Sequence, residues 1–155
     1  VLVITQTIPT VAVAPLLVLW MGYGILPKIM LILLTSFFPI TIGLLDGFHS
    51  VDRDMLNLLK TMGATSFQNF IHLKLPSSLG YFFAGLRISV SYSIIGAVVA
   101  EWLGGYDGLG VYMTRVRKSY SFDKMFAVIF LISGISLLLM YFVKKIQRWC
   151  MTWER

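Results

Sequence analysis

Four long apolar runs divide this chain of 155 residues, and they restrict its possible folds more than any other feature. No charged residue occurs from Val1 to Pro27, and the runs that follow Lys28 and Lys124 are almost as apolar. A helix needs about 20 mostly apolar residues to cross a lipid bilayer. The pattern therefore predicts an all-α, polytopic membrane protein in a single domain, with about four spans over residues 3–26, 28–48, 79–103 and 125–143.

Composition supports this assignment and excludes other classes of protein. Charged residues make up 13% of the chain and the mean hydropathy is +0.81, whereas an average soluble chain is about 25% charged. The net charge of +6 comes from basic residues beside the spans, as membrane topology favours, so we expect a lipid bilayer and no nucleic acid as their partner. The single cysteine, Cys150, allows no internal disulfide, and no histidine–cysteine set has the spacing of a metal or cofactor site.

The third run differs from the others because it contains both charges and many small residues. Arg87 lies about one third of the way along it, and Glu101 lies near its end. A charge such as Arg87 either faces a protein interior or reaches back to the membrane surface. Small residues recur at every fourth position: Gly85, Ser89, Ser93 and Ala97. Such a row lets another helix backbone come close, so we expect this span to be central in the bundle or to line a path.

The stretch between the second and third runs, residues 49–78, predicts two short helices that meet at a glycine. Apolar residues within 54–62 fall on one helical face. Gly63 follows at a place where helices commonly end. Thr65 and Gln68 then have the spacing of a capping box, which indicates the start of the second helix.

The spacing in this stretch resembles the cytoplasmic loop of binding-protein-dependent ABC importer permeases. The family signature is Glu-Ala-Ala, three residues, Gly, nine residues, Ile, one residue and Leu-Pro. The matching residues here are Gly63, Leu73, Leu75 and Pro76, and Asn57, Leu58 and Leu59 stand where the family has Glu-Ala-Ala. A role specific to that glutamate is therefore not carried over. Pro76 is expected to stop the second short helix and to begin the third span.

Two further segments, QTIPTVAVAPLLVLWMGYG and AEWLGGYDGLG, are similar to one branch of this family, which imports nitrate, sulfonates, taurine or pyrimidine precursors of thiamine. The resemblance implies a permease subunit, and not an enzyme, in the membrane of a bacterial cell. We expect a pyrimidine precursor as the substrate, with sulfonate, taurine or nitrate as the alternative. Family members carry more spans upstream, so this chain is expected to be a permease truncated at its N-terminus.

The resemblance also implies a division of labour between several chains. Two permease subunits, expected here to be a homodimer, form the translocation path, and an extracytoplasmic binding protein delivers the substrate. ABC ATPase subunits bind ATP and grip the cytoplasmic loop, whose expected contact residues are Asn57, Met62, Gly63, Ala64, Phe67, Leu73, Leu75 and Pro76. Met62 and Phe67 flank the bend and are expected to be its buried anchors. The residues expected in the translocation path or its gate are Arg87, Ser91 and Glu101.

Two other classes stay open at this stage, a membrane-embedded enzyme subunit and a passive channel. An enzyme would have to build its chemistry from His72, Glu101, Asp107 and Asp123, yet alternating spans place the first two on opposite sides of the membrane. Polar serines and tyrosines in the third span would suit a channel. The segment GGYDGLG lacks the lysine and the hydroxyl group of a phosphate-binding loop, so it is expected to be a tight external turn.

Alternating spans also predict a topology. With the C-terminal tail in the cytoplasm, the 49–78 loop lies inside the cell and the 104–124 loop lies outside. Single cysteines at Gln68 and Asp107, each in a Cys150→Ser background, should therefore react with an impermeant thiol reagent from opposite sides of the membrane. Labelling of both positions from the same side would contradict this topology.

Overall fold

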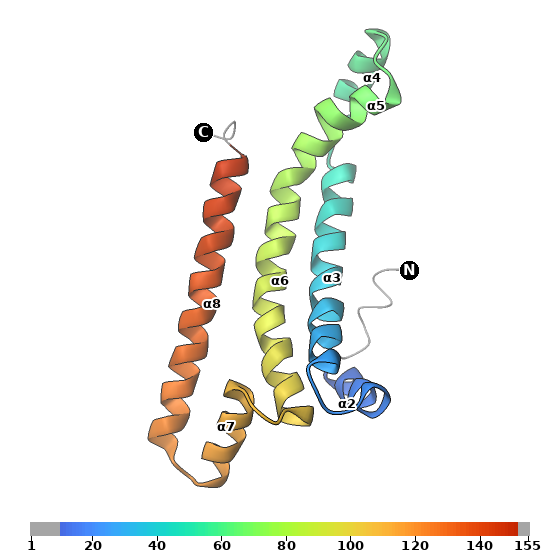
Figure 1. Cartoon of the computed structure of the whole chain (residues 1–155). Helices are drawn as coiled ribbons and strands as arrows, with labels where there is room; N and C mark the ends of the chain where they lie inside the picture. Colours follow the sequence, from blue (N-terminus) through green and yellow to red (C-terminus); the bar gives the residue numbers. More distant parts are fainter. Residues whose placement is uncertain (1–9, 152–155) are drawn as a thin grey trace.

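The computed structural model describes residues 10–151, and the regular structure in that part of the chain is helical (Figure 1). Its elements are α2 (Thr10–Met21), α3 (Leu26–His49), α4 (Arg53–Thr61), α5 (Ser66–Asn69), the π-helix η1 (Phe70–Lys74), α6 (Leu75–Gly104), α7 (Leu109–Lys118) and α8 (Phe122–Cys150). Three helical stretches are long and apolar enough to cross a membrane: α3, the run from Ser66 to Gly104, and α8. The predicted all-α membrane fold is confirmed.

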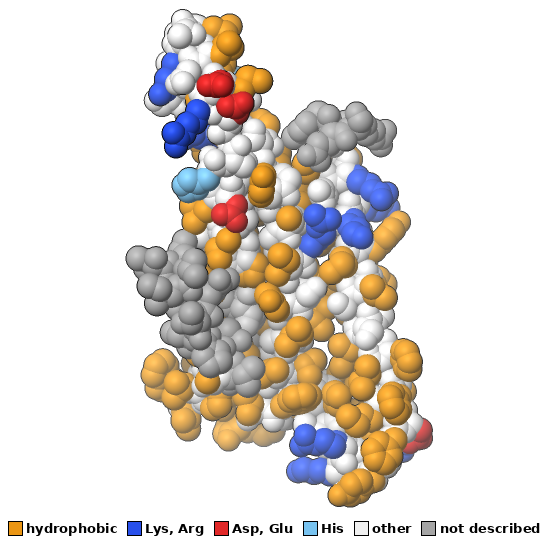
Figure 2. All heavy atoms as spheres, turned by 180° about the vertical axis from the view of Figure 1, so that it is seen from behind, with side chains coloured by type: hydrophobic (Ala, Val, Ile, Leu, Met, Phe, Trp, Pro, Cys, Tyr) orange, Lys and Arg blue, Asp and Glu red, His pale blue; other side chains and the backbone are white. Residues whose placement is uncertain are grey.

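The three long helices lie side by side, with α6 between α3 and α8 (Figure 1). The third predicted span is central, because α6 packs against α2, α3, α7 and α8. The short helices α4 and α5 project beyond one end of the bundle, while α2 and α7 lie at the other end. Figure 2 shows mainly hydrophobic side chains along the middle of one face, with charged side chains toward both ends. This distribution is the one expected of a protein that crosses a membrane.

The first expected span, 3–26, differs most from the prediction. Residues 3–9 lie outside the described residues, and α2 ends at Met21. Gly22 follows with a φ of +76°, a left-handed conformation that ends helices, and α3 begins with a proline in its first turn. The 12 residues of α2 extend about 18 Å, which is less than the roughly 30 Å of a bilayer core. In Figure 1, α2 lies across the end of α3.

Glycines in α3 bring its backbone into direct contact with α6. A Cβ atom on Gly43 would lie 2.7 Å from the carbonyl oxygen of Tyr81, and one on Gly47 would lie 2.7 Å from the Cα of Ser78. Both distances are shorter than any real Cβ contact. Any larger residue at either position would therefore push the two helices apart.

The contact continues from the α6 side through Gly85 and Ser89. A Cβ atom on Gly85 would overlap the carbonyl oxygen of Pro39. The hydroxyl group of Ser89 donates a hydrogen bond of 2.5 Å to the carbonyl oxygen of Ser36. Water cannot hydrate a backbone carbonyl group inside a membrane. The Ser89 hydrogen bond therefore stabilises the α3–α6 pair in addition to the close packing.

The buried face of α6 follows only half of the predicted row of small residues. Gly85 and Ser89 are buried as predicted, but Ser93 and Ala97 are only half-buried. Gly96 and Ala100 are buried in their place. The reason is geometric, because residues four apart on a helix differ by about 40° in direction, and a strict four-residue row winds away from the contact.

The chain after α6 is more helical than predicted. The 104–124 loop contains α7, which buries Val111 and Val116 and exposes its basic residues. The last helix, α8, covers 29 residues and ends at Cys150, whereas the predicted span stops at residue 143. Hydropathy identifies only the apolar part of a helix, while the helix itself continues into polar sequence as long as its backbone hydrogen bonds are satisfied.

The close approach of α3 and α6 leads to a stability prediction. Gly85→Ala should lower the free energy of unfolding by about 1–3 kcal/mol, because the added methyl group overlaps the Pro39 carbonyl. Gly134→Ala is the matched control, since Gly134 also lies inside a long helix but has nothing within 4 Å of its Cβ position. Thermal unfolding in detergent measures both variants. Equal melting temperatures for the two variants would contradict the proposed backbone contact.

Candidate functional site

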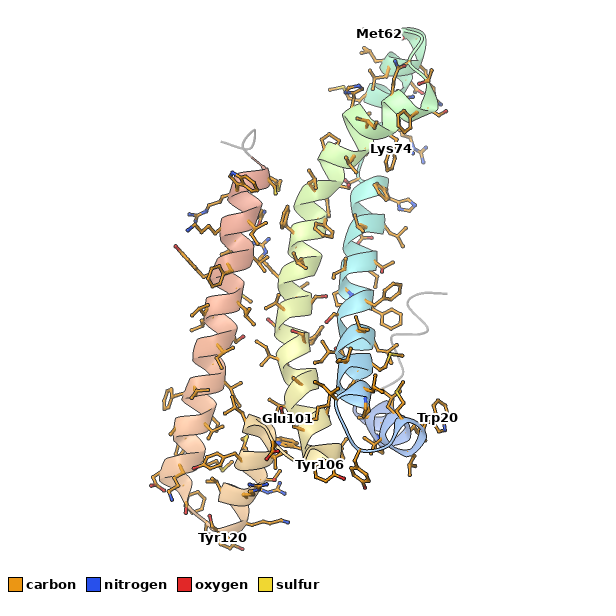
Figure 3. The ribbon with its side chains drawn as sticks, in the orientation of Figure 1. Trp20, Met62, Lys74, Glu101, Tyr106 and Tyr120 are labelled. Atoms are coloured by element: carbon orange, nitrogen blue, oxygen red, sulfur yellow. The ribbon has the colours of Figure 1, made fainter. Side chains whose placement is uncertain are left out.

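The most distinctive feature at one end of the molecule is the protruding segment 53–74, here called the knob. It comprises α4, α5 and η1 and extends beyond the end of α3, with Met62 at its tip (Figure 3). None of the residues of α4 is buried. The knob therefore has little support from the rest of the described chain.

The first half of the knob is built by local hydrogen bonds at both ends of α4. The carboxylate of Asp52 accepts a hydrogen bond of 2.9 Å from the backbone N–H of Asp54 and so caps the start of the helix. At the other end, Gly63 has a φ of +80°. The N–H groups of Gly63 and Ala64 donate to two carbonyl groups in the last turn of α4, each at 3.0 Å, the pattern of a Schellman motif. The predicted glycine bend is confirmed.

The second half of the knob starts with the predicted capping box. The backbone N–H of Gln68 donates to the Thr65 hydroxyl group at 3.3 Å, and the N–H of Thr65 donates to the Gln68 side chain at 2.8 Å. These reciprocal bonds satisfy two backbone groups that a helix start leaves free. They fix the direction in which α5 leaves the bend.

Apolar side chains of the knob are exposed around this bend. Met62 is 74% exposed and Phe67 is 70% exposed, so the prediction that they are buried anchors is wrong within this chain. Met55 and Leu58 are more than half exposed as well. Of the other predicted loop residues, Asn57 and Leu75 are exposed, and Ala64, Leu73 and Pro76 are half-buried. Large apolar side chains gathered on a protruding element are typical of a protein–protein contact.

The prediction that Pro76 stops the second short helix is wrong. The helical run continues without a break from Ser66 to Gly104, and Pro76 is the second residue of α6. The π-helix η1 explains this continuity, because the N–H of Leu75 bonds to the carbonyl of Phe70, five residues back. A proline ring clashes with the carbonyl four residues before it, and the wider π turn directly before Pro76 relieves that clash.

The base of the knob contacts the bundle through an aromatic pair and contains one buried polar residue. Asn69 is buried, and no described group bonds its Oδ1 atom. The rings of Phe48 in α3 and Phe70 in η1 lie 5.8 Å apart between their centroids. Phe48 and Phe70 lie far apart in sequence, so only the three-dimensional structure reveals this contact.

Arg87 and Ser91 lie together on α6, one helical turn apart. Both are half-buried, and the Ser91 hydroxyl group donates a 3.5 Å hydrogen bond to the Arg87 carbonyl. Each is two residues from Ser89, which corresponds to about 200° around a helix. They therefore lie on the side of α6 opposite the Ser89 contact with α3.

Glu101 lies at the opposite end of α6 from the knob, beside the turn that leads to α7 (Figure 3). Its carboxylate accepts a hydrogen bond of 2.6 Å from the backbone N–H of Gly110. The structure thus explains the segment GGYDGLG as a turn that wraps around Glu101. Spaced glycines were the visible signal, but the groups against which they pack could not be read from the sequence.

The arrangement gives no support to the enzyme alternative. His72 and Glu101 lie 29 positions apart on one continuous helical run, which corresponds to about 44 Å. The described residues contain no group of three or more side chains that could hold a metal ion. The four residues considered for catalysis thus do not form one site.

Comparison with known proteins agrees with the membrane-spanning helical fold. Residues 1–150 match the family described as "Binding-protein-dependent transport system inner membrane component". The chain belongs to this family. It is therefore an inner-membrane transport component of the ABC permease class, a transport subunit and not an enzyme.

Individual relatives in this permease family are similar over nearly the whole chain. A formylaminopyrimidine transport permease, ThiX of Halalkalibacterium halodurans, is 42% identical over 99% of the chain and 62% of its own length. A probable ABC transporter permease of Haemophilus influenzae is 42% identical, over 91% and 58%. A putative aliphatic sulfonates transport permease, SsuC of Bacillus subtilis, is 31% identical, over 96% and 54%. The chain thus spans about 60% of the length of these curated relatives.

Proposed function

We propose that this permease chain forms part of the translocation path of an ATP-driven importer and that the knob is its contact with the ATPase. One observation carries the proposal: the exposed knob stands at the end of a single helical run of 39 residues. That run is about 58 Å long. It is long enough to connect a protein on one membrane surface with the opposite surface.

The continuity of this run is what makes it suitable for transmitting a movement. A proline that broke the helix would act as a joint between the knob and the membrane, whereas the π turn keeps the backbone hydrogen bonds connected. A displacement of Phe67 therefore reaches α6 through a helix. It then reaches α3 through the glycine contacts, because tightly packed helices cannot slide freely.

The expected partners follow from this arrangement and from the family description, which names a binding-protein-dependent system. ABC ATPase subunits dock on the knob and bind the ATP. A second copy of the permease completes the path, with Arg87, Ser91 and Glu101 as path or gate residues. An extracytoplasmic binding protein delivers the substrate at the end of the bundle that carries α2 and α7. Lipid covers the remaining apolar surface.

The proposed substrate is a pyrimidine precursor of thiamine. It is supported by the 42% identity to a permease named for formylaminopyrimidine transport. An aliphatic sulfonate is the second candidate, supported by the 31% identity to SsuC of Bacillus subtilis. The charged residues in the described part of the chain do not distinguish the two candidate substrates. A path residue that paired strongly with either substrate would also slow its release.

The knob proposal is tested at Gly63, whose Cβ position is open but whose φ is +80°. Gly63→Val should strain the backbone by about 1–3 kcal/mol and weaken ATPase association tenfold or more. Gly63→Asn is the matched control, because asparagine adopts this backbone conformation far more readily, so it should retain most of the association. Co-purification of the ATPase in mild detergent and substrate-stimulated ATP hydrolysis measure both variants.

These outcomes separate a docking site from a surface connector. Both variants should insert into the membrane normally, because the long helices are unchanged. A Gly63→Val transporter that retains the ATPase and imports at the wild-type rate would show that the knob is not the contact.

The substrate proposal is tested by competition for uptake into vesicles that contain the assembled transporter and its binding protein. Excess unlabelled formylaminopyrimidine should abolish uptake of the labelled compound, and an aliphatic sulfonate should not compete. Binding of each compound to the isolated binding protein provides the control. If only the sulfonate is bound and taken up, the substrate is the second candidate and not the pyrimidine precursor.

A further inference from the structure

Glu101 occupies an unusual place in the last turn of α6. Its neighbour Ala100 belongs to the buried cluster formed with Ala14, Leu17 and Leu31, which joins α2, α3 and α6. Glu101 itself is half-buried, and its side chain lies beside the turn that connects α6 to α7 (Figure 3). A carboxylate in this position needs a strong hydrogen-bond donor.

The backbone at the start of α7 supplies that donor. The N-cap residue of α7 is Gly108, which has no side chain to cap the helix. The Oε2 atom of Glu101 instead accepts the N–H of Gly110 at 2.6 Å. The positive end of the α7 dipole further favours a negative charge here. Glu101 thus does the capping from a different helix.

The position of the Glu101 carboxylate requires a glycine at 108, and other close contacts require the glycines on either side of it. A Cβ atom on Gly108 would overlap the Glu101 carboxyl group, and the residue has a φ of +137°. A Cβ atom on Gly105 would lie 2.6 Å from the Val111 side chain and 2.8 Å from the Glu101 carbonyl oxygen. One on Gly110 would lie 2.8 Å from the Val98 carbonyl oxygen and 3.0 Å from the Oε2 atom of Glu101. The chain can pass the carboxylate at Gly108 only because this residue lacks a side chain, and the lack of side chains at Gly105 and Gly110 lets the rest of the turn pack closely against α6 and Val111.

Further contacts hold the middle of the α6–α7 turn in place. The guanidinium group of Arg115 in α7 donates to the Tyr106 carbonyl at 3.1 Å. The ring of Tyr106 lies 6.1 Å from that of Tyr23, measured between centroids, and the Lys28 ammonium group donates to the Asp107 carbonyl at 3.4 Å. The α6–α7 turn is therefore attached to α7 and to the α2–α3 corner.

We propose that Glu101 is a positioning residue that fixes α7 to α6, so that the two helices move as one body during transport. The inference rests on the proposed function, in which a movement starts at the knob. The contact of Glu101 with α7 is where that movement ends. The knob lies at one end of the helical run and the Glu101 contact at the other. Movement of the run then carries α7 with it at the far surface of the membrane, where substrate enters.

The test compares Glu101→Ala and Glu101→Gln in the assembled transporter with its ATPase and binding protein. Spin labels at Ile95→Cys in α6 and Lys118→Cys in α7, in a Cys150→Ser background, report the distance between the two helices. Both labelled side chains are exposed. The maximal rate of uptake is measured on the same proteins at saturating binding protein. Asp107→Asn is the matched control, because this carboxylate is in the same turn and is exposed.

We expect Glu101→Ala to broaden the distance distribution and to lower the maximal uptake rate about tenfold or more, since it removes the acceptor of the Gly110 N–H. Glu101→Gln keeps an acceptor oxygen at the same place and should rescue both readouts in large part. Asp107→Asn should match the wild type. Rescue by glutamine distinguishes positioning through the Gly110 hydrogen bond from a role that needs the negative charge itself.

Three results would overturn the inference. One is a narrow distance distribution in Glu101→Ala at any uptake rate, since α7 would then be held without Glu101. Another is a broad distribution with wild-type uptake, since the position of α7 would then not matter. The third is failure of Glu101→Gln to restore either readout. Failure of the proposed function is distinct, because the unmutated protein would then retain no ATPase and import no substrate.

Discussion

The contact between the backbones of α3 and α6 is the interaction on which the rest of the structure depends. Lipid is as apolar as the side chains, so helices in a membrane are held together by close packing and by hydrogen bonds between them. Gly43, Gly47 and Gly85 remove the side chains that would separate the two helices. The Ser89 hydroxyl group adds a bond to the Ser36 carbonyl. By comparison, α8 leaves most of its length exposed, and its surface is available to lipid or to other chains.

With α3 as its support, α6 connects two specialised ends of the molecule. One end is the knob, whose shape is set by caps and by a positive φ at Gly63 and whose apolar side chains are exposed. The other end is the turn around Glu101, where α2, α6 and α7 meet. The π turn before Pro76 keeps the connection helical. This is the arrangement that a transport subunit needs if a partner on one side of the membrane is to change the path on the other.

Local interactions account for what could be predicted of the candidate site. Gly63 and the Thr65–Gln68 box act within a few residues of the chain, so their spacing was sufficient to predict two short helices that meet at a glycine. The Asp52 cap is equally local but was not predicted. Pro76 was misread, because the rule that proline ends a helix omits the wider π turn that accommodates it. The helix α7 was missed because its N-cap comes from Glu101, on the preceding helix. The row of small residues on α6 was only half right, because its direction depends on where α3 lies.

The sequence by itself determined the membrane-spanning helical class, the place of the glycine bend and the family signature. Each of these depends on hydropathy or on spacing along the chain, and both are properties of a single helix or turn. The tertiary structure decided which face of α6 meets α3, how α2 lies against α3, and what the glycines of GGYDGLG surround. These features depend on groups from different helices coming within contact distance. Spacing along the sequence carries no information about such distances until the helices have packed.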